Sequence, residues 1–112
     1  MTGFKKDLIV LVADDDIRHA VNVLLSDRLK SLGIRPVSFD IMNCPNRDSG
    51  CFHESEKLLG PLIPLYSFAM VMFDREGCGR ESKDVHDIQR DVQNKLDLKG
   101  WRGRSAVIVF DP

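Results

Sequence analysis

Four stretches of the sequence have the hydrophobic patterns of β-strands. Three of them are apolar throughout, which is typical of strands buried on both faces of a sheet. These three are residues 8–13, 68–73 and 106–110. The fourth stretch, residues 34–42, alternates apolar and polar side chains and contains Pro36, a combination that indicates a strand at the edge of a sheet.

Three intervening stretches carry apolar residues at helical spacing. The predicted helices cover residues 17–32, 53–63 and 82–98. One of the aspartates at 14–16 is expected to cap the first helix and Gly33 to end it, since these residue types suit the two helix ends. Residues 43–50 have the composition of turns and predict an exposed loop.

The alternation of strands and helices predicts the fold class. A chain that alternates in this way forms a parallel sheet covered by helices on both faces. We therefore predict an α/β three-layer sandwich with a four-stranded, mainly parallel sheet in the order 2-1-3-4. The length of 112 residues fits a single domain over residues 1–112. Because the sequence ends directly after an apolar run, we also consider that it is a fragment of a longer protein.

The composition is that of an ordinary globular domain. Hydrophobic residues make up 43% of the chain and charged residues 29%, and the formal net charge is −1. This charge does not point to nucleic acid, and no apolar run approaches the roughly 20 residues of a membrane span, so we expect no membrane partner. We find no signal peptide, and three cysteines are an odd number for a disulfide framework, so we predict a cytoplasmic protein with free thiols.

Acidic residues follow three of the four predicted strands. They are Asp14, Asp15 and Asp16 after residues 8–13, Asp74 and Glu76 after residues 68–73, and Asp111 after residues 106–110. Ligands of open α/β sheets bind where the strand order reverses, which is here between the first and third strands. Oxygen ligands suit Mg²⁺ or Mn²⁺, so we predict a metal site that includes Asp74, Glu76 and Asp15. The alternative is that these acids only cap a helix or open a turn.

Other residues near these acids have two interpretations each. Gly77 allows a sharp turn and a close approach of the backbone to a ligand. Arg75 is a candidate for phosphate contact, as are Arg47 and Arg80, but it can equally pair with a neighbouring acid. Four other residues are of the types that bind zinc, but no two of the cysteines among them are closely spaced, so we interpret all four as loop or buried residues. These candidates are Cys44, Cys51, His53 and Cys78.

The chain resembles the Toprim domain of topoisomerases, bacterial primases, recombination proteins and phage-defence nucleases. The resemblance rests on the acidic loop after the first strand, on the helix closed by Leu32-Gly33-Ile34, and on Asp74-Arg75-Glu76-Gly77 after a later strand. In that family a glutamate after the first strand acts as general acid/base, and here Asp14 or Asp15 holds the position. The family's Asp-x-Asp motif binds Mg²⁺, and here Asp74 matches its first acid and Glu76 replaces its second.

The resemblance implies a Mg²⁺-dependent, nuclease-like domain that processes phosphodiesters in genome defence or DNA repair, with nucleic acid as its substrate. The alternative is a Toprim-like interaction domain that is catalytically silent and binds a protein partner. A third interpretation is a receiver-like phosphoacceptor domain, because Val12-Ala-Asp-Asp-Asp16 before a helix resembles the acidic loop of response regulators. Asp74 would then be the acceptor by position, although a receiver also needs a fifth strand and a lysine after the fourth.

Overall fold

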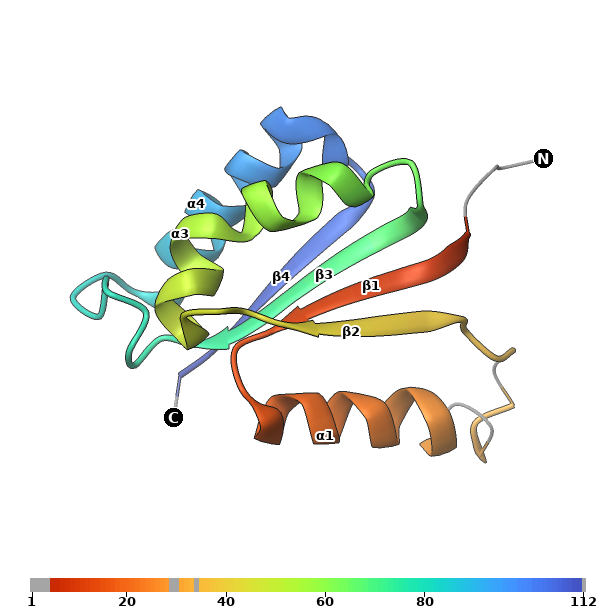
Figure 1. Ribbon diagram of the computed structural model, residues 1–112. Helices are drawn as coiled ribbons and strands as arrows, with labels where there is room; N and C mark the ends of the chain where they lie inside the picture. The colour runs from red at the N-terminus through yellow and green to blue at the C-terminus, as the bar shows by residue number, and fades with distance from the viewer. Residues whose placement is uncertain (1–4, 29–30, 34, 112) are drawn as a thin grey trace.

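The computed structural model describes residues 5–28, 31–33 and 35–111, which form four strands and three α-helices (Figure 1). The strands are β1 (Lys6–Val12), β2 (Phe39–Asn43), β3 (Tyr66–Asp74) and β4 (Ser105–Phe110). The α-helices are α1 (Asp15–Val23), α3 (Arg47–Leu59) and α4 (Val85–Leu96). Each continues into a short segment of π- or 3₁₀-helix, and these segments are η1 (Leu24–Arg28), η2 (Gly60–Leu62) and η3 (Asp97–Trp101).

The four strands form one parallel sheet in the order β2-β1-β3-β4, which confirms the predicted fold class and strand order. Helix α1 lies on one face of the sheet, and α3 and α4 lie on the other (Figure 1). Val12 at the end of β1 is in register with Asn43 of β2 and with Met72 of β3. The segments that follow these three strands therefore leave the sheet at the same edge, next to one another.

The alternation of side chains along the strands divides the apolar core between the two faces. On the face of α3 and α4, the strand residues Leu11, Val71 and Phe73 are fully buried in one apolar cluster with residues of both helices. On the opposite face, Val10 and Val12 of β1 pack against Val21 of α1. Strand β1 is therefore buried from Leu8 to Val12, whereas β3 alternates between buried and half-buried residues.

The predicted helix over residues 17–32 is α-helical to Val23 and π-helical from Leu24 to Arg28, and it is α-helical again at Ser31, so the described residues confirm it up to its last residue, Leu32. Leu29, which belongs to the predicted apolar stripe, lies outside the described residues. Leu32 of the same stripe is 70% exposed, so it does not contribute to the core. Gly33 has a φ of 72°, the left-handed conformation of a helix C-terminal cap.

The predicted exposed loop at 43–50 is wrong over its second half, because α3 already begins at Arg47. Cys44 and Gly50 are buried there. A Cβ atom on Gly50 would lie 3.1 Å from Cβ of Asn46 and 3.5 Å from Cβ of Cys44. The absence of a side chain at Gly50 therefore lets the first turn of α3 pack tightly against the segment that follows β2.

In contrast to α3, the edge strand and the last helix begin later than the sequence predicts. Strand β2 starts at Phe39, and Ile34 of the predicted strand lies outside the described residues. Helix α4 starts at Val85, with Asp84 rather than Ser82 as its cap, since the Asp84 carboxylate accepts a hydrogen bond from the backbone N–H of Asp87. These shifts leave the order and the layers of the fold unchanged.

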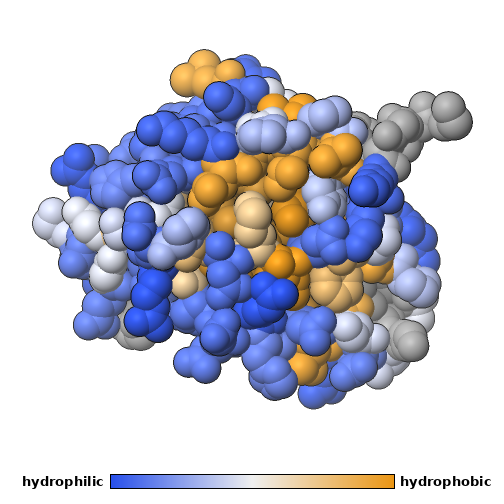
Figure 2. Space-filling model, in the orientation of Figure 1, coloured by the Kyte–Doolittle hydropathy of each residue, from blue (hydrophilic) through white to orange (hydrophobic). Residues whose placement is uncertain are grey.

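Apolar side chains also reach the surface between α3 and the edge strand β2 (Figure 2). Leu58 of α3 and Met42 of β2 are half-buried and pack against the core beneath. Within the described residues, no helix has both the length and the apolar character needed to cross a membrane.

Candidate metal centre

Three aspartates from three elements meet at the carboxyl edge of the sheet. Asp14 is the N-cap of α1, Asp48 lies in the first turn of α3, and Asp74 is the last residue of β3. One carboxylate oxygen from each lies within 4.8 Å of those of the other two. All three residues are half-buried. We call Asp14, Asp48 and Asp74 the aspartate triad.

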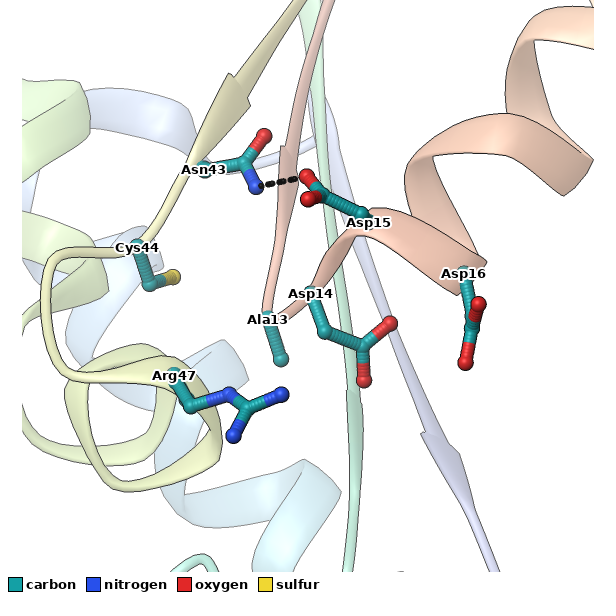
Figure 3. A pocket seen from close by; sticks show the side chains of 7 residues that line it. All are labelled: Ala13, Asp14, Asp15, Asp16, Asn43, Cys44 and Arg47. Atoms are coloured by element: carbon teal, nitrogen blue, oxygen red, sulfur yellow. Dashed lines mark hydrogen bonds between the residues drawn. The ribbon is translucent and has the colours of Figure 1, made fainter.

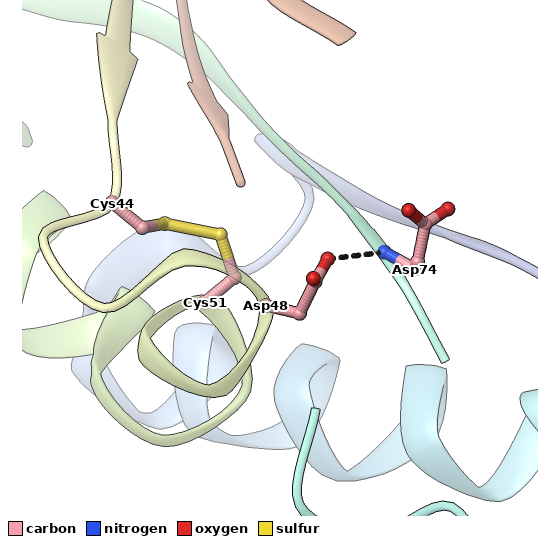
Figure 4. Close-up of a disulfide and its surroundings, with 4 residues drawn as sticks. All are labelled: Cys44, Asp48, Cys51 and Asp74. Atoms are coloured by element: carbon pink, nitrogen blue, oxygen red, sulfur yellow. Dashed lines mark hydrogen bonds between the residues drawn. A yellow bond between two sulfur atoms is a disulfide. The ribbon is translucent and has the colours of Figure 1, made fainter. Parts of the chain in front are cut away.

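Backbone hydrogen bonds fix two members of the aspartate triad. Oδ1 of Asp14 accepts a hydrogen bond of 2.9 Å from the backbone N–H of Ile17, as a helix cap does. Oδ1 of Asp48 accepts one of 2.8 Å from the backbone N–H of Asp74 (Figure 4). Each of these carboxylates keeps its second oxygen for another partner. The described part of the chain offers no hydrogen bond to the Asp74 side chain, which is therefore fully available.

The electrostatics of the aspartate triad favour a cation. Burial raises the pKa of Asp74, and the negative charges of Asp48, Asp14 and Glu76 raise it further. A divalent cation between these groups would replace the mutual repulsion by attraction, so the raised pKa and the spacing point to the same kind of ligand.

The spacing of the triad is close to that of a Mg²⁺ site. Six oxygens at about 2.1 Å from Mg²⁺ lie about 3 Å apart when they are neighbours and about 4.2 Å apart when they are opposite. The three carboxylate oxygens lie within 4.8 Å of one another, so side-chain shifts of less than about 1 Å would bring them to the spacing of Mg²⁺ ligands. Mg²⁺ usually keeps several waters and takes few protein carboxylates, so three aspartates are sufficient.

The remaining acids of the first loop lie beside the triad rather than in it. Asp15 is exposed, and its Oδ1 accepts a hydrogen bond of 3.0 Å from the side-chain amide of Asn43 (Figure 3). Asp16 is exposed in the first turn of α1. Together with Asp14 they line a hollow of about 260 Å³. A second hollow of about 340 Å³ adjoins it at Asp14 and Asp16, and apolar side chains such as Met72 and Phe110 line it.

The acids and the arginine after β3 and β4 form a separate group. Arg75 donates a hydrogen bond of 2.9 Å from Nε to Asp111 and another from its guanidinium to the carbonyl of Glu81. Glu76 is exposed and lies in the same group. Of the two interpretations of Arg75, the structure therefore contains the pairing with a neighbouring acid, and that acid is Asp111. Glu76 acts on the triad only through its charge on Asp74.

Asp48 is the member of the triad that sequence reasoning misses. Its segment has turn composition, and the aspartate in it is of the type that commonly stabilises a turn. The available signal is positional, because residues 43–50 follow the strand next to β1 and leave the sheet at the edge that carries Asp14. An acid in this segment is therefore brought to the same edge by topology alone.

Arg47 brings a positive charge to this site. It lines the hollow with Asp14, and its guanidinium faces the Asp14 carboxylate (Figure 3). Within the described residues its side chain has no hydrogen bond or ion pair. An exposed arginine beside carboxylates that attract a cation is suited to a phosphate group that also contacts the metal.

The cysteines differ from the prediction. Cys44 and Cys51 form a disulfide with a Cα–Cα distance of 5.9 Å, so the prediction of free thiols is wrong for these two residues (Figure 4). Cys78 is free and fully buried. Because a zinc-binding cysteine must be a thiolate, the disulfide also excludes Cys44 and Cys51 as zinc ligands in this state.

Gly77 shapes the turn that brings the backbone close to Asp48. Its φ is +88°, and a Cβ atom there would lie 3.4 Å from Oδ2 of Asp48. Gly103 has a similar φ of +75° with no atom within 4 Å of such a Cβ. We expect Gly77→Ala and Gly103→Ala to lower the free energy of unfolding by a similar amount, about 1–2 kcal/mol, because both place a side chain in the left-handed region.

Only Gly77→Ala should also weaken Mn²⁺ binding severalfold, because its methyl group removes water from Asp48 and restricts the movement of that carboxylate. Thermal unfolding and isothermal titration with Mn²⁺ of both variants measure the two effects. Equal affinities for the two variants would contradict a role for the Asp48 carboxylate in binding.

Comparison of the chain with protein-family models, with curated proteins and with solved structures found no match. The Toprim resemblance therefore stays a prediction that rests on the residues quoted above. What the structure adds is the α/β fold and the aspartate triad at its switch point.

Proposed function

We propose that this domain binds Mg²⁺ or Mn²⁺ through the aspartate triad and cleaves or transfers phosphodiesters, as the Toprim resemblance implies. The observation that carries the proposal is the convergence of Asp14, Asp48 and Asp74 at the strand-order reversal. Arg47, which has no partner among the described side chains, supplies the positive charge for a phosphate. We further propose nucleic acid as the substrate, the cytoplasm as the location, and genome defence or repair as the setting.

The residues around the triad would have different roles in such a reaction. A bound divalent cation would polarise a phosphorus–oxygen bond and lower the pKa of water. Arg47 would hold the phosphate in the polar hollow, and the apolar hollow beside Met72 and Phe110 would take the sugar or base. Asp15, oriented by Asn43, is in position to accept or give a proton.

Cleavage assays test this proposal directly. Supercoiled plasmid, single-stranded DNA and single-stranded RNA are each incubated with the protein in Mg²⁺, in Mn²⁺ or in EDTA. We expect metal-dependent cleavage that Asp48→Asn abolishes and that Asp16→Asn, a matched change of an exposed neighbouring acid, leaves nearly intact. Mn²⁺ binding without cleavage of any substrate would favour the catalytically silent interaction domain instead.

A phosphoacceptor domain is the second candidate, and one observation favours it. Asp74 ends a central strand with a side chain that accepts no hydrogen bond within the described residues, and two further aspartates stand beside it. Incubation with acetyl phosphate and Mg²⁺ separates this candidate from the first. Addition of one phosphoryl group to the intact mass, lost in Asp74→Asn, would support the phosphoacceptor, and an unchanged mass would argue against it.

The raised pKa of Asp74 predicts a pH dependence. Metal binding requires the carboxylate, so Mn²⁺ affinity should fall as the pH is lowered through the raised pKa of Asp74. Folding favours the protonated form of this residue, so in the metal-free protein its contribution to stability should increase as the pH falls through the same range. Mn²⁺ titrations and thermal unfolding of wild type and Asp74→Asn across pH 4–8 measure both effects. A pH-independent difference between the two proteins would contradict this prediction.

A further inference from the structure

The Cys44–Cys51 disulfide encloses the segment that carries Asp48. We propose that this disulfide is a redox switch, which positions Asp48 in the aspartate triad when oxidised and releases it when reduced. The inference rests on the proposed function, because it assigns a regulation to the same metal site. It accounts for a disulfide in a protein whose proposed location is the reducing cytoplasm, where such bonds are commonly regulatory or catalytic.

Besides the disulfide, two backbone hydrogen bonds lie within the enclosed segment, from the N–H of Arg47 to the carbonyl of Cys44 and from the N–H of Gly50 to the carbonyl of Asn46. Asn46, the N-cap of α3, makes no side-chain hydrogen bond to the helix. Arg47 has a φ of 54°, and it is the only non-glycine residue with a positive φ in the described ranges. Such a conformation is costly and persists when the surroundings impose it. The disulfide and these local hydrogen bonds impose it together, because the disulfide ties the segment after β2 to the second turn of α3 on either side of Arg47.

Asp48 transmits the state of the disulfide to the triad. It follows the strained Arg47 and contacts the end of β3 through its hydrogen bond to the backbone N–H of Asp74. Figure 4 shows the disulfide at the base of this turn and the Asp48 carboxylate reaching from it toward Asp74. When the bond is broken, Arg47 can relax to a negative φ, which turns the next residue away from Asp74.

The disulfide can be reached from the hollow next to the triad. Cys51 is fully buried, but Cys44 is 5% exposed and lines the hollow of about 260 Å³ (Figure 3). A thiolate of a dithiol reductant therefore attacks Sγ of Cys44, and Cys51 leaves as a thiolate that takes up a proton. The second thiol of the reductant then releases Cys44. Two electrons pass to the protein, which gains two thiols, and the reductant becomes a disulfide.

Metal binding and oxidation must favour each other. If the oxidised protein binds Mn²⁺ more tightly than the reduced protein, then Mn²⁺ stabilises the disulfide by the same factor. A tenfold difference in affinity corresponds to a shift of about 30 mV in the two-electron midpoint potential. This reciprocity gives a second measurement that does not depend on catalysis.

The test compares Mn²⁺ affinity in the two redox states. Protein is reduced with dithiothreitol, desalted without oxygen and titrated with Mn²⁺ beside the oxidised protein and the Cys44→Ser/Cys51→Ser variant. We expect the reduced protein and the variant to bind Mn²⁺ about tenfold more weakly than the oxidised protein. Asp48→Asn should be weak in both states, and the matched control Cys78→Ser should respond to reduction as wild type does.

Amide NMR shifts separate failure of the switch from failure of the metal site. The Asp74 N–H, which is bonded to Asp48, should shift on reduction even without metal. Two results would overturn the switch. One is that the protein forms no Cys44–Cys51 disulfide under oxidising conditions. The other is that reduction changes neither the chemical shift of the Asp74 amide nor the affinity for Mn²⁺. An Asp74 amide that shifts in a protein that binds no Mn²⁺ in either state would support the redox-dependent position of Asp48 and refute the metal site.

Discussion

Replacing Asp74 by asparagine is expected to weaken Mn²⁺ binding by at least about a hundredfold, since even outer-shell groups of metal sites are worth 10–100-fold. Asp74 is the member of the triad whose side chain accepts no hydrogen bond from the described residues, so it has the most oxygen to offer. Burial and the neighbouring acids raise its pKa, and a bound cation would relieve both penalties on its negative charge. Asparagine keeps the shape and one oxygen but removes that charge. Isothermal titration with Mn²⁺ measures the loss.

The control for this change is Asp16→Asn. Asp16 lies two residues after Asp14, is exposed and is outside the triad, so its loss removes one negative charge from the same loop without removing a ligand. We expect less than about a threefold change, because exposed charges interact weakly through water. Similar losses for the two variants would mean that general charge, and not ligation by Asp74, attracts the cation.

Replacing Trp101 by alanine is expected to destabilise the domain by about 3–5 kcal/mol, the usual cost of removing a buried tryptophan. Trp101 is fully buried, and its indole N–H donates a hydrogen bond of 3.2 Å to the carbonyl of Leu59. It thereby joins η3 to the end of α3, the helix that carries Asp48 at its other end. Domains of this size are stable by only about 5–15 kcal/mol, so the melting temperature should fall by more than about 10 °C.

Leu98→Ala is the matched control for Trp101→Ala. Leu98 lies in the same η3 segment but is 83% exposed, so its truncation should change the free energy of unfolding by less than about 0.5 kcal/mol. Chemical denaturation of both variants measures the difference. If Trp101→Ala lowers the free energy of unfolding as little as Leu98→Ala does, burial of Trp101 contributes little to the packing of α3.

The sequence predicts this fold because the pattern that defines it is strong and local. Three apolar runs and one alternating stretch become the four strands, and their alternation with helices leaves few possible topologies. The same topology brings Asp14 and Asp74 together, since each follows one of two neighbouring parallel strands. This part of the site therefore needs no information beyond the order of the elements.

The rest of the site depends on interactions that a linear pattern does not show. The sequence predicts that Glu76 shares a metal site with Asp74, but β3 ends at Asp74 and the chain turns at Gly77, so the two side chains do not follow one extended strand. Asp48 lies in a segment of turn composition that becomes helical where Gly50 packs against Cys44 and Asn46. Three cysteines do not reveal which two of them pair, and that pairing holds the segment of Asp48.

Anomalous diffraction from crystals soaked in Mn²⁺ tests the shared cation site most directly. We predict one peak with carboxylate oxygens of Asp14, Asp48 and Asp74 at about 2.0–2.6 Å from it, the range of divalent cations bound by oxygen. We expect the peak to be absent from Asp74→Asn crystals treated in the same way. A fully soaked wild-type crystal with no peak at the triad, or with a peak at Glu76 and Asp111 instead, would contradict a cation site at the triad.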